Sequence, residues 1–116
     1  MKKYNEGYIK FDLKWDKKSV VLPESMLSEL NNFRTNLFDL GLIGMYPDGI
    51  GFGNISIRFG NTDQFIITGS ATGQLRTLTK EHFSLVTGFD IEKNTVICEG
   101  QIAASSESMS HAALYK

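Results

Sequence analysis

Hydrophobic and polar residues alternate along several short stretches of this chain. In the first, residues 8–15, the apolar side chains fall on one side of an extended chain: Ile9, Phe11, Leu13 and Trp15. This alternation predicts a half-buried strand. The lysines on its other side favour a position at the edge of a sheet, where charge discourages pairing with a second molecule. The alternative is that these lysines form a basic binding strip.

One longer stretch repeats with a helical period instead. It begins at Pro23-Glu24-Ser25 and ends before Gly41, and proline near the start and glycine past the end are the usual helix boundaries. Between them the apolar residues recur every three or four positions: Met26, Leu30, Phe33, Leu37 and Leu40. We expect an amphipathic helix that packs this stripe on a sheet as part of the core.

Four further stretches are short, apolar-rich and alternating: residues 54–59, 64–68, 83–89 and 95–98. They predict strands, and Gly60-Asn61 predicts the turn of a hairpin between the first two. Thr79 is predicted to start a short turn or helix before the third strand, with His82 at the surface. Cys98 is expected to be a packed thiol rather than a nucleophile, because no histidine is placed next to it in sequence.

Three polar turns interrupt this pattern: the glycine-rich residues 41–53, residues 68–73, and Ala104-Ser105-Ser106-Glu107 before the helical pattern of residues 108–115. Backbone N–H groups of glycine-rich loops and helix starts can hold an anion together with serine hydroxyls, and a neighbouring carboxylate can move a proton. Two ordinary interpretations stay open. The loops can be simple connections, and a serine with an acidic residue can serve to cap a helix.

Composition limits the classes of function. The 116 residues suffice for one domain, carry a net charge of -1 and are 41% hydrophobic. Their basic residues are scattered and no apolar run is long enough to cross a bilayer, so we expect neither nucleic acid nor a membrane as partner. A single cysteine and the lack of a secretory signal pattern indicate a cytoplasmic protein.

Four motifs occur in a fixed order. Gly53-Asn54-Ile55-Ser56-Ile57-Arg58 resembles Gly-Asn-x-Ser-x-Arg, and residues 65–73 are similar to Ile-Thr-Pro-Ser/Thr-Gly. Leu78-Thr79 matches the Leu-Thr that follows, and residues 105–115 contain Ser-Ser-Glu-x-x-x-His-x-x-x-Tyr. In this order and spacing the motifs resemble the N-terminal half of the class II aldolase/adducin family, which includes sugar-phosphate aldolases such as fuculose-phosphate aldolase and the adducin head domain.

The resemblance implies an α/β fold with three α/β/α layers around a mostly antiparallel mixed sheet, of which residues 1–116 would form a single, incomplete domain. It implies a metal-dependent lyase acting on a phosphorylated ketose or related sugar, with Glu107 as the catalytic acid/base. It assigns the substrate phosphate to five residues: Asn54, Thr72, Gly73, Ser105 and Ser106. A non-catalytic assembly module, as in adducin, is the rival function.

The sequence departs from the family pattern at three places. The aldolases carry a hydroxyl three residues before the asparagine, where this chain has Gly51. The second loop is longer than the pattern, which leaves Ser70 and Thr72 as rival phosphate partners. The family's zinc is held by a His-x-His pair and a third histidine, which would all lie beyond Lys116.

The available histidines, His82 and His111, do not reach the three ligands of a catalytic zinc. We therefore expect zinc only in a longer form and no metal site in this chain. Because His111 lies four residues after Glu107 on a predicted helix, we expect it either to orient that carboxylate or to pack.

The final helical pattern has no stop signal, so we expect a truncated or proteolysed portion of a longer protein. A natural remnant, stable only as an oligomer, is the alternative, because half a sheet exposes edge strands. A homo-oligomer is the expected assembly.

Overall fold

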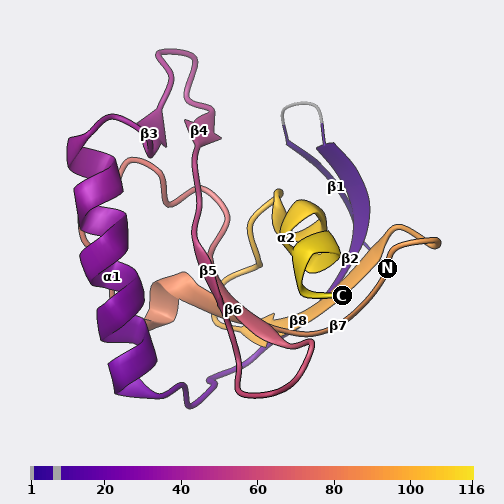
Figure 1. The fold of residues 1–116 in the computed structure, drawn as a ribbon. Helices are drawn as coiled ribbons and strands as arrows, with labels where there is room; N and C mark the ends of the chain where they lie inside the picture. The colour runs from indigo at the N-terminus through magenta and orange to yellow at the C-terminus, as the bar shows by residue number, and fades with distance from the viewer. Residues whose placement is uncertain (1, 7–8) are drawn as a thin grey trace.

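The computed structural model describes the backbone of residues 2–6 and 9–116 and the side chains from Phe11 onward. The elements in chain order are β1 (Lys2–Glu6), β2 (Ile9–Lys17), α1 (Glu24–Asp39), β3 (Gly44–Met45), β4 (Gly51–Phe52), β5 (Ser56–Arg58), β6 (Phe65–Thr68), the 3-10 helix η1 (Lys80–His82), β7 (Phe83–Asp90), β8 (Thr95–Gly100) and α2 (Ser108–Tyr115). Within these residues one sheet has the order β1-β2-β8-β7-β6-β5, and β3 and β4 form a separate hairpin (Figure 1). The fold is α/β, as predicted.

The sheet is mixed, because β2 and β8 run parallel whereas its other neighbouring strands run antiparallel. The predicted hairpin and the two later strands are confirmed as β5, β6, β7 and β8. The predicted edge position of the first strand is wrong, since β2 pairs with β1 on one side and β8 on the other. Its alternation identifies a buried face but not whether another strand pairs beside it. The predicted first residue of this strand, Tyr8, lies outside the described residues.

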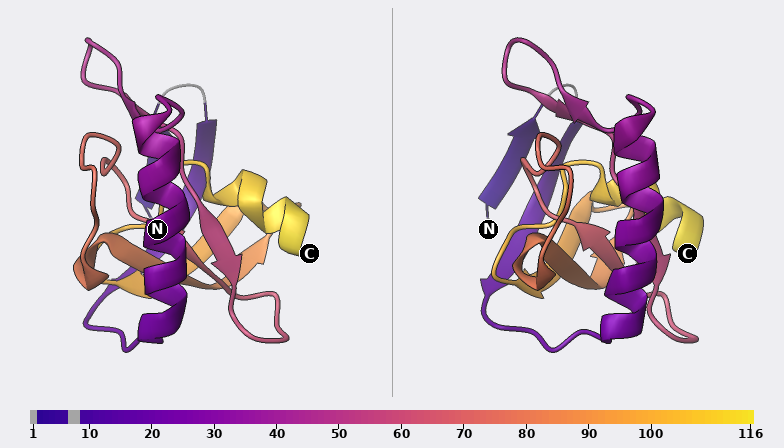
Figure 2. Two further views of the ribbon diagram at one scale, coloured as in Figure 1. Left: turned by 60° about the vertical axis from the view of Figure 1, so that its left-hand side comes forward. Right: turned by 90° about the vertical axis from the view of Figure 1, so that its left-hand side faces the viewer.

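Side chains from the sheet enter two hydrophobic cores on its opposite faces. On β6, Phe65 and Ile67 point to one core, which includes Ala112 of α2, and Ile66 points to the other, which includes Leu30 of α1. This division follows from the alternation of side chains along a strand. In Figure 1, β5 and β6 accordingly run between α1 and α2. Figure 2 shows the two helices and the sheet from two further sides.

Helix α1 packs by a stripe that matches the predicted one in part, since Leu30 is buried and Met26 packs against the same core. Its buried residues are Leu27, Leu30 and Arg34. Phe33 and Leu40, which were expected in the core, are 59% and 73% exposed. The spacing of hydrophobic residues did not predict this face fully, because the long polar side chain of Arg34 points inward and bonds to backbone carbonyl groups there. Neither helix of the described chain has the length and apolar character to span a membrane.

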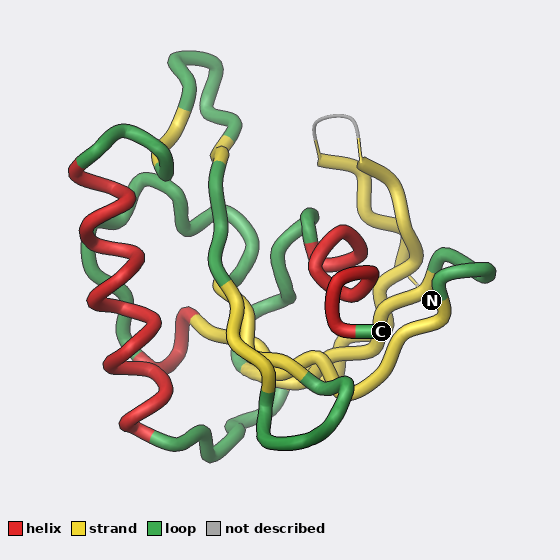
Figure 3. The backbone as a smooth tube through the Cα atoms, in the orientation of Figure 1, coloured by secondary structure: helices red, strands yellow, loops and turns green. Residues whose placement is uncertain are grey.

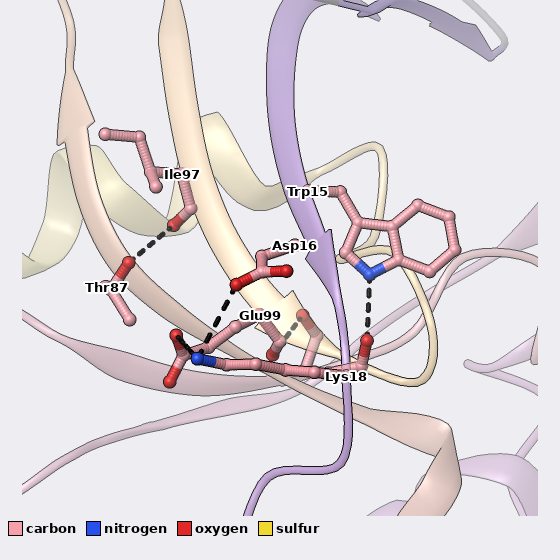
Figure 4. A network of polar contacts seen from close by, with 8 residues as sticks. Trp15, Asp16, Lys18, Thr87, Ile97 and Glu99 are labelled. Atoms are coloured by element: carbon pink, nitrogen blue, oxygen red, sulfur yellow. Dashed lines mark hydrogen bonds and ion pairs between the residues drawn. The ribbon is translucent and has the colours of Figure 1, made fainter.

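A polar network covers part of the sheet where β2 and β8 run side by side (Figure 4). Lys18 Nζ lies 3.1 Å from Glu99 Oε2 and 3.5 Å from Asp16 Oδ2. The Trp15 indole N–H donates to the Gly100 carbonyl at 2.9 Å. The Glu99 carboxylate raises the pKa of Lys18. Because Lys18 and Asp16 are exposed to solvent, these ion pairs contribute little to stability.

Candidate functional site

The turn that follows β6 is tied to the segment that precedes α2. The backbone N–H of Ser70 donates to the Ala103 carbonyl at 2.9 Å, and the N–H of Ser105 donates to the Thr68 carbonyl at 3.2 Å. These bonds join two segments more than thirty residues apart in sequence. They bring the second and third predicted polar turns, drawn as green tube in Figure 3, into direct contact.

The first predicted turn reaches the same place through the hairpin β3–β4, which sequence analysis had treated as an irregular loop. Glycine is required where this hairpin approaches its neighbours. A Cβ atom on Gly73 would lie 2.2 Å from the Gly44 carbonyl oxygen. Gly53 has a φ of +79°, and a Cβ there would lie 2.3 Å from the Leu42 carbonyl oxygen. A side chain at position 73 would push the second turn away from the hairpin, and one at position 53 would clash within the first turn itself.

A pocket of about 40 Å³ lies between the three turns. All six residues predicted for the site line it: Asn54, Thr72, Gly73, Ser105, Ser106 and Glu107. Gly51 and Ser70 line it too, so both rival hydroxyls of the second turn are at the pocket. A cavity needs roughly 10–15 Å³ of such space to hold one water. The pocket therefore has room for a small polar group.

Local hydrogen bonds determine what each hydroxyl group can offer to a ligand. The Thr72 hydroxyl donates to the Gly69 carbonyl at 2.9 Å, so its proton is already used within the turn. Ser105 Oγ accepts from the backbone N–H of Glu107 at 3.2 Å and keeps its own proton to donate. An anion would therefore meet a hydroxyl donor at Ser105, whereas Thr72 would contribute through its backbone.

Glu107 lies at the pocket as the N-cap residue of α2. The backbone N–H of Ser110 donates to its carbonyl at 3.0 Å, which starts the helix. The alternative prediction of a serine at the N-cap is therefore wrong, because Ser105 Oγ accepts from the N–H of Glu107, the N-cap residue that directly precedes the helix. Among the described residues that line the pocket, Glu107 carries the single charge. It is half-buried there, beside the positive end of the helix.

Asn54 is held by side chains of α2. Its Oδ1 accepts a hydrogen bond from Nε2 of His111. His111 Nδ1 lies 2.6 Å from Ser56 Oγ, which lies 2.9 Å from the Tyr115 hydroxyl. Burial lowers the pKa of His111 and favours the neutral ring. The imidazole thus binds Asn54 and Ser56 rather than orienting the Glu107 carboxylate, which was one of the two roles expected for it.

Sequence analysis missed the side chain that holds the second turn from α1. Arg34 is 1% exposed. Its Nη1 donates to the Leu75 carbonyl at 2.7 Å and the Arg76 carbonyl at 3.2 Å, and its Nη2 donates to the Thr72 carbonyl at 2.8 Å. Burial lowers the pKa of Arg34, although guanidinium stays protonated in proteins. Arg34 lies four residues after Leu30, so the two side chains share one face of the helix. This spacing was the signal available in the sequence.

The histidines and the cysteine do not assemble a metal site. The described part of the chain contains no group of three or more residues that could ligate a metal ion. His82 Nδ1 accepts from the Thr79 N–H at 2.9 Å, while His111 belongs to the network around Asn54. Cys98 is buried and its thiol pKa is raised by that burial, so the predicted packed thiol is confirmed. These residues do not fit a catalytic zinc, and we assign no step to a metal.

Comparison with known families gives one match. The sequence profile of the class II aldolase and adducin N-terminal domain matches residues 47–116. This segment includes β4 to β8, α2 and every residue predicted for the site. Comparisons with curated proteins and with solved structures gave no match. Because the profile covers more than half of the chain, the protein belongs to the class II aldolase/adducin family.

Proposed function

We propose that this chain supplies the phosphate-binding turns and the proton-transfer carboxylate of an aldolase-type site that acts on a phosphorylated ketose or related sugar. The observation that carries the proposal is the pocket itself, in which Asn54, Thr72 and Ser106 come together from separate segments, with Glu107 beside Ser106. Family membership supports it but does not distinguish a lyase from an assembly module.

The pocket would hold a phosphate group mainly with neutral donors. These are the backbone N–H groups at Thr72 and Gly73, the hydroxyls of Ser105 and Ser106, and the side-chain amide of Asn54. The positive end of α2 and the Arg34 guanidinium behind the Thr72 carbonyl add favourable electrostatic potential. These terms would offset the repulsion between the phosphate and the Glu107 carboxylate.

Glu107 is the group suited to proton transfer in this pocket. Cleavage between the α and β carbons of a β-hydroxy ketone removes the hydroxyl proton, releases the β carbon as an aldehyde and leaves an enediolate. A carboxylate that takes up this proton can return it to the α carbon. A phosphate held by the neighbouring turns would fix the reacting carbon relative to the carboxyl group.

A non-catalytic assembly module remains the second candidate, and one observation favours it. Several large apolar side chains on α1, just after it and near the hairpin β3–β4 are exposed: Phe33, Leu40, Leu42 and Tyr46. Apolar surface of this kind is common where proteins associate. We propose that it contributes to a homo-oligomer, which is compatible with either function.

Calorimetric titration of the full chain tests the proposed function. We expect inorganic phosphate and a ketose phosphate to bind, and the parent ketose without phosphate to bind at least about tenfold more weakly, since it lacks the charge-assisted hydrogen bonds. Ser106→Ala should weaken phosphate binding, whereas Ser110→Ala, on the exposed face of α2, should not. Equal affinity for the sugar with and without phosphate would contradict the proposal. A chain that binds neither but self-associates in sedimentation analysis would favour the assembly module.

A further inference from the structure

We propose that His111 is a positioning residue that fixes the orientation of the Asn54 side-chain amide, so that its nitrogen, and not its oxygen, is presented to an anion. The inference rests on the proposed phosphate site. It concerns the network formed by four side chains, Asn54, Ser56, His111 and Tyr115, in which the imidazole connects β5 and its preceding residues to α2.

The hydrogen bonds of this network have one consistent direction. Asn54 Oδ1 can only accept, so His111 Nε2 carries the proton of the neutral ring. His111 Nδ1 then accepts from the Ser56 hydroxyl at 2.6 Å. The Ser56 oxygen in turn accepts from the Tyr115 hydroxyl at 2.9 Å. Every donor in this arrangement meets one acceptor, so the chain from Tyr115 to Asn54 specifies the imidazole tautomer.

The tautomer determines which end of the Asn54 amide is left for a ligand. An amide has one end that accepts hydrogen bonds and one that donates them. With Oδ1 bound to His111, the group that Asn54 keeps for the pocket is the NH₂ donor. The opposite orientation would place a carbonyl oxygen against the anion and would leave His111 without its acceptor. The imidazole thus holds the Asn54 side-chain amide, which could otherwise flip, with its NH₂ group as the donor towards the pocket.

The spacing of these residues shows why two distant motifs act as one unit. Asn54 and Ser56 are two residues apart on an extended segment and share one side of it, while His111 and Tyr115 are four apart and share one side of a helix. Phe65 lies beside both rings, with centroid distances of 6.5 Å to His111 and 4.8 Å to Tyr115. This packing limits rotation of the imidazole away from Asn54.

Two conservative variants of His111 separate its two nitrogen atoms. The amide nitrogen of glutamine reaches about the position of Nε2, so His111→Gln keeps a donor for Asn54. The amide of asparagine reaches about the position of Nδ1, so His111→Asn keeps the contact with Ser56 and loses the one with Asn54. Both remove the aromatic contact with Phe65 equally. We expect the full chain with His111→Gln to bind inorganic phosphate about tenfold more tightly than His111→Asn, the effect of one charge-assisted hydrogen bond.

Nitrogen-15 NMR of the imidazole gives an independent readout. We expect the wild-type chain to show a neutral His111 with the proton on Nε2 near pH 7. A proton on Nδ1, or equal phosphate affinities for His111→Gln and His111→Asn when both are folded by circular dichroism, would overturn the inference. If the wild-type chain shows the Nε2 tautomer but does not bind phosphate, the proposed function fails, and with it the role of the oriented amide towards an anion.

Discussion

Two side chains support the pocket from opposite faces of the sheet, and they do so by different means. Arg34 of α1 is charged and donates to backbone carbonyl groups of the second turn and of the residues just after it, whereas His111 of α2 is neutral and bonds to the side chains of Asn54 and Ser56. A clamp on the backbone determines the shape of a turn, and a contact with one amide determines the orientation of one donor. We therefore expect Arg34 to govern stability and His111 to govern ligand binding.

The largest expected effect is that of Arg34→Met. The variant leaves the carbonyl groups of Thr72, Leu75 and Arg76 without their buried donor, and each such loss costs about 1–3 kcal/mol. We expect the free energy of unfolding, measured in urea, to fall by about 3–5 kcal/mol. Arg76→Met, which removes an exposed bidentate ion pair with Asp39, is the matched control and should cost no more than about 1 kcal/mol. Similar decreases in the free energy of unfolding for both variants would contradict a special stabilising role for the buried hydrogen bonds of Arg34.

A smaller effect is expected for Gly73→Ala, which tests whether the turns must approach closely. Its Cβ would lie 2.2 Å from the Gly44 carbonyl oxygen, and overpacking of this kind costs about 1–3 kcal/mol. Phosphate binding should decrease as well, since the hairpin must move away from the second turn. Gly88→Ala is the control, because the nearest heavy atom, on Ile97, would lie 3.5 Å from its Cβ. If Gly73→Ala retains both stability and binding, the close approach has no role in the pocket.

The pH dependence of stability should reveal the buried imidazole. The folded pKa of His111 lies below its ordinary value of 6.5, so the unfolded chain binds a proton first as the pH falls. Stability should therefore decrease as the pH falls from about 7 through 6.5 towards the folded pKa, by at most about 1.4 kcal/mol for each pH unit crossed.

The difference between the wild-type chain and His111→Gln isolates this dependence, measured by urea denaturation between about pH 5.5 and 7.5. Glu107 on α2 is present in both chains, as is Arg58, whose guanidinium carbon lies 5.1 Å from the Tyr115 ring centroid. Parallel stability curves for the two chains would contradict a buried, neutral His111.

The smallest effect is expected on the open face of the sheet. Lys18→Met removes two exposed ion pairs, with Asp16 and Glu99, in the network of Figure 4. Since solvent screens such pairs, neither the melting temperature nor phosphate affinity should change measurably. If Lys18→Met lost as much stability as Arg34→Met, burial would not explain why the hydrogen bonds of Arg34 stabilise the fold more than the ion pairs of Lys18.

Alternation along the chain predicted β2, β5, β6, β7 and β8 but not β1, β3 or β4, and motifs resembling those of the family supplied the residues of the pocket. They did not predict contacts between distant segments. Arg34 faces inward because carbonyl groups about forty residues later need donors, and Asn31 bonds both the N–H and the carbonyl of Leu78 for the same reason. His111 is another example, since its partner Asn54 is 57 residues away.

A titration of the full chain with inorganic phosphate, followed by the backbone amide signals in NMR, tests the central claim most directly. We predict that the signals of Gly73, Ser106 and Glu107 shift together and yield one dissociation constant, because their turns line one pocket. Shifts confined to a single turn, or to surface lysines such as Lys80, would contradict an anion site built from separate turns.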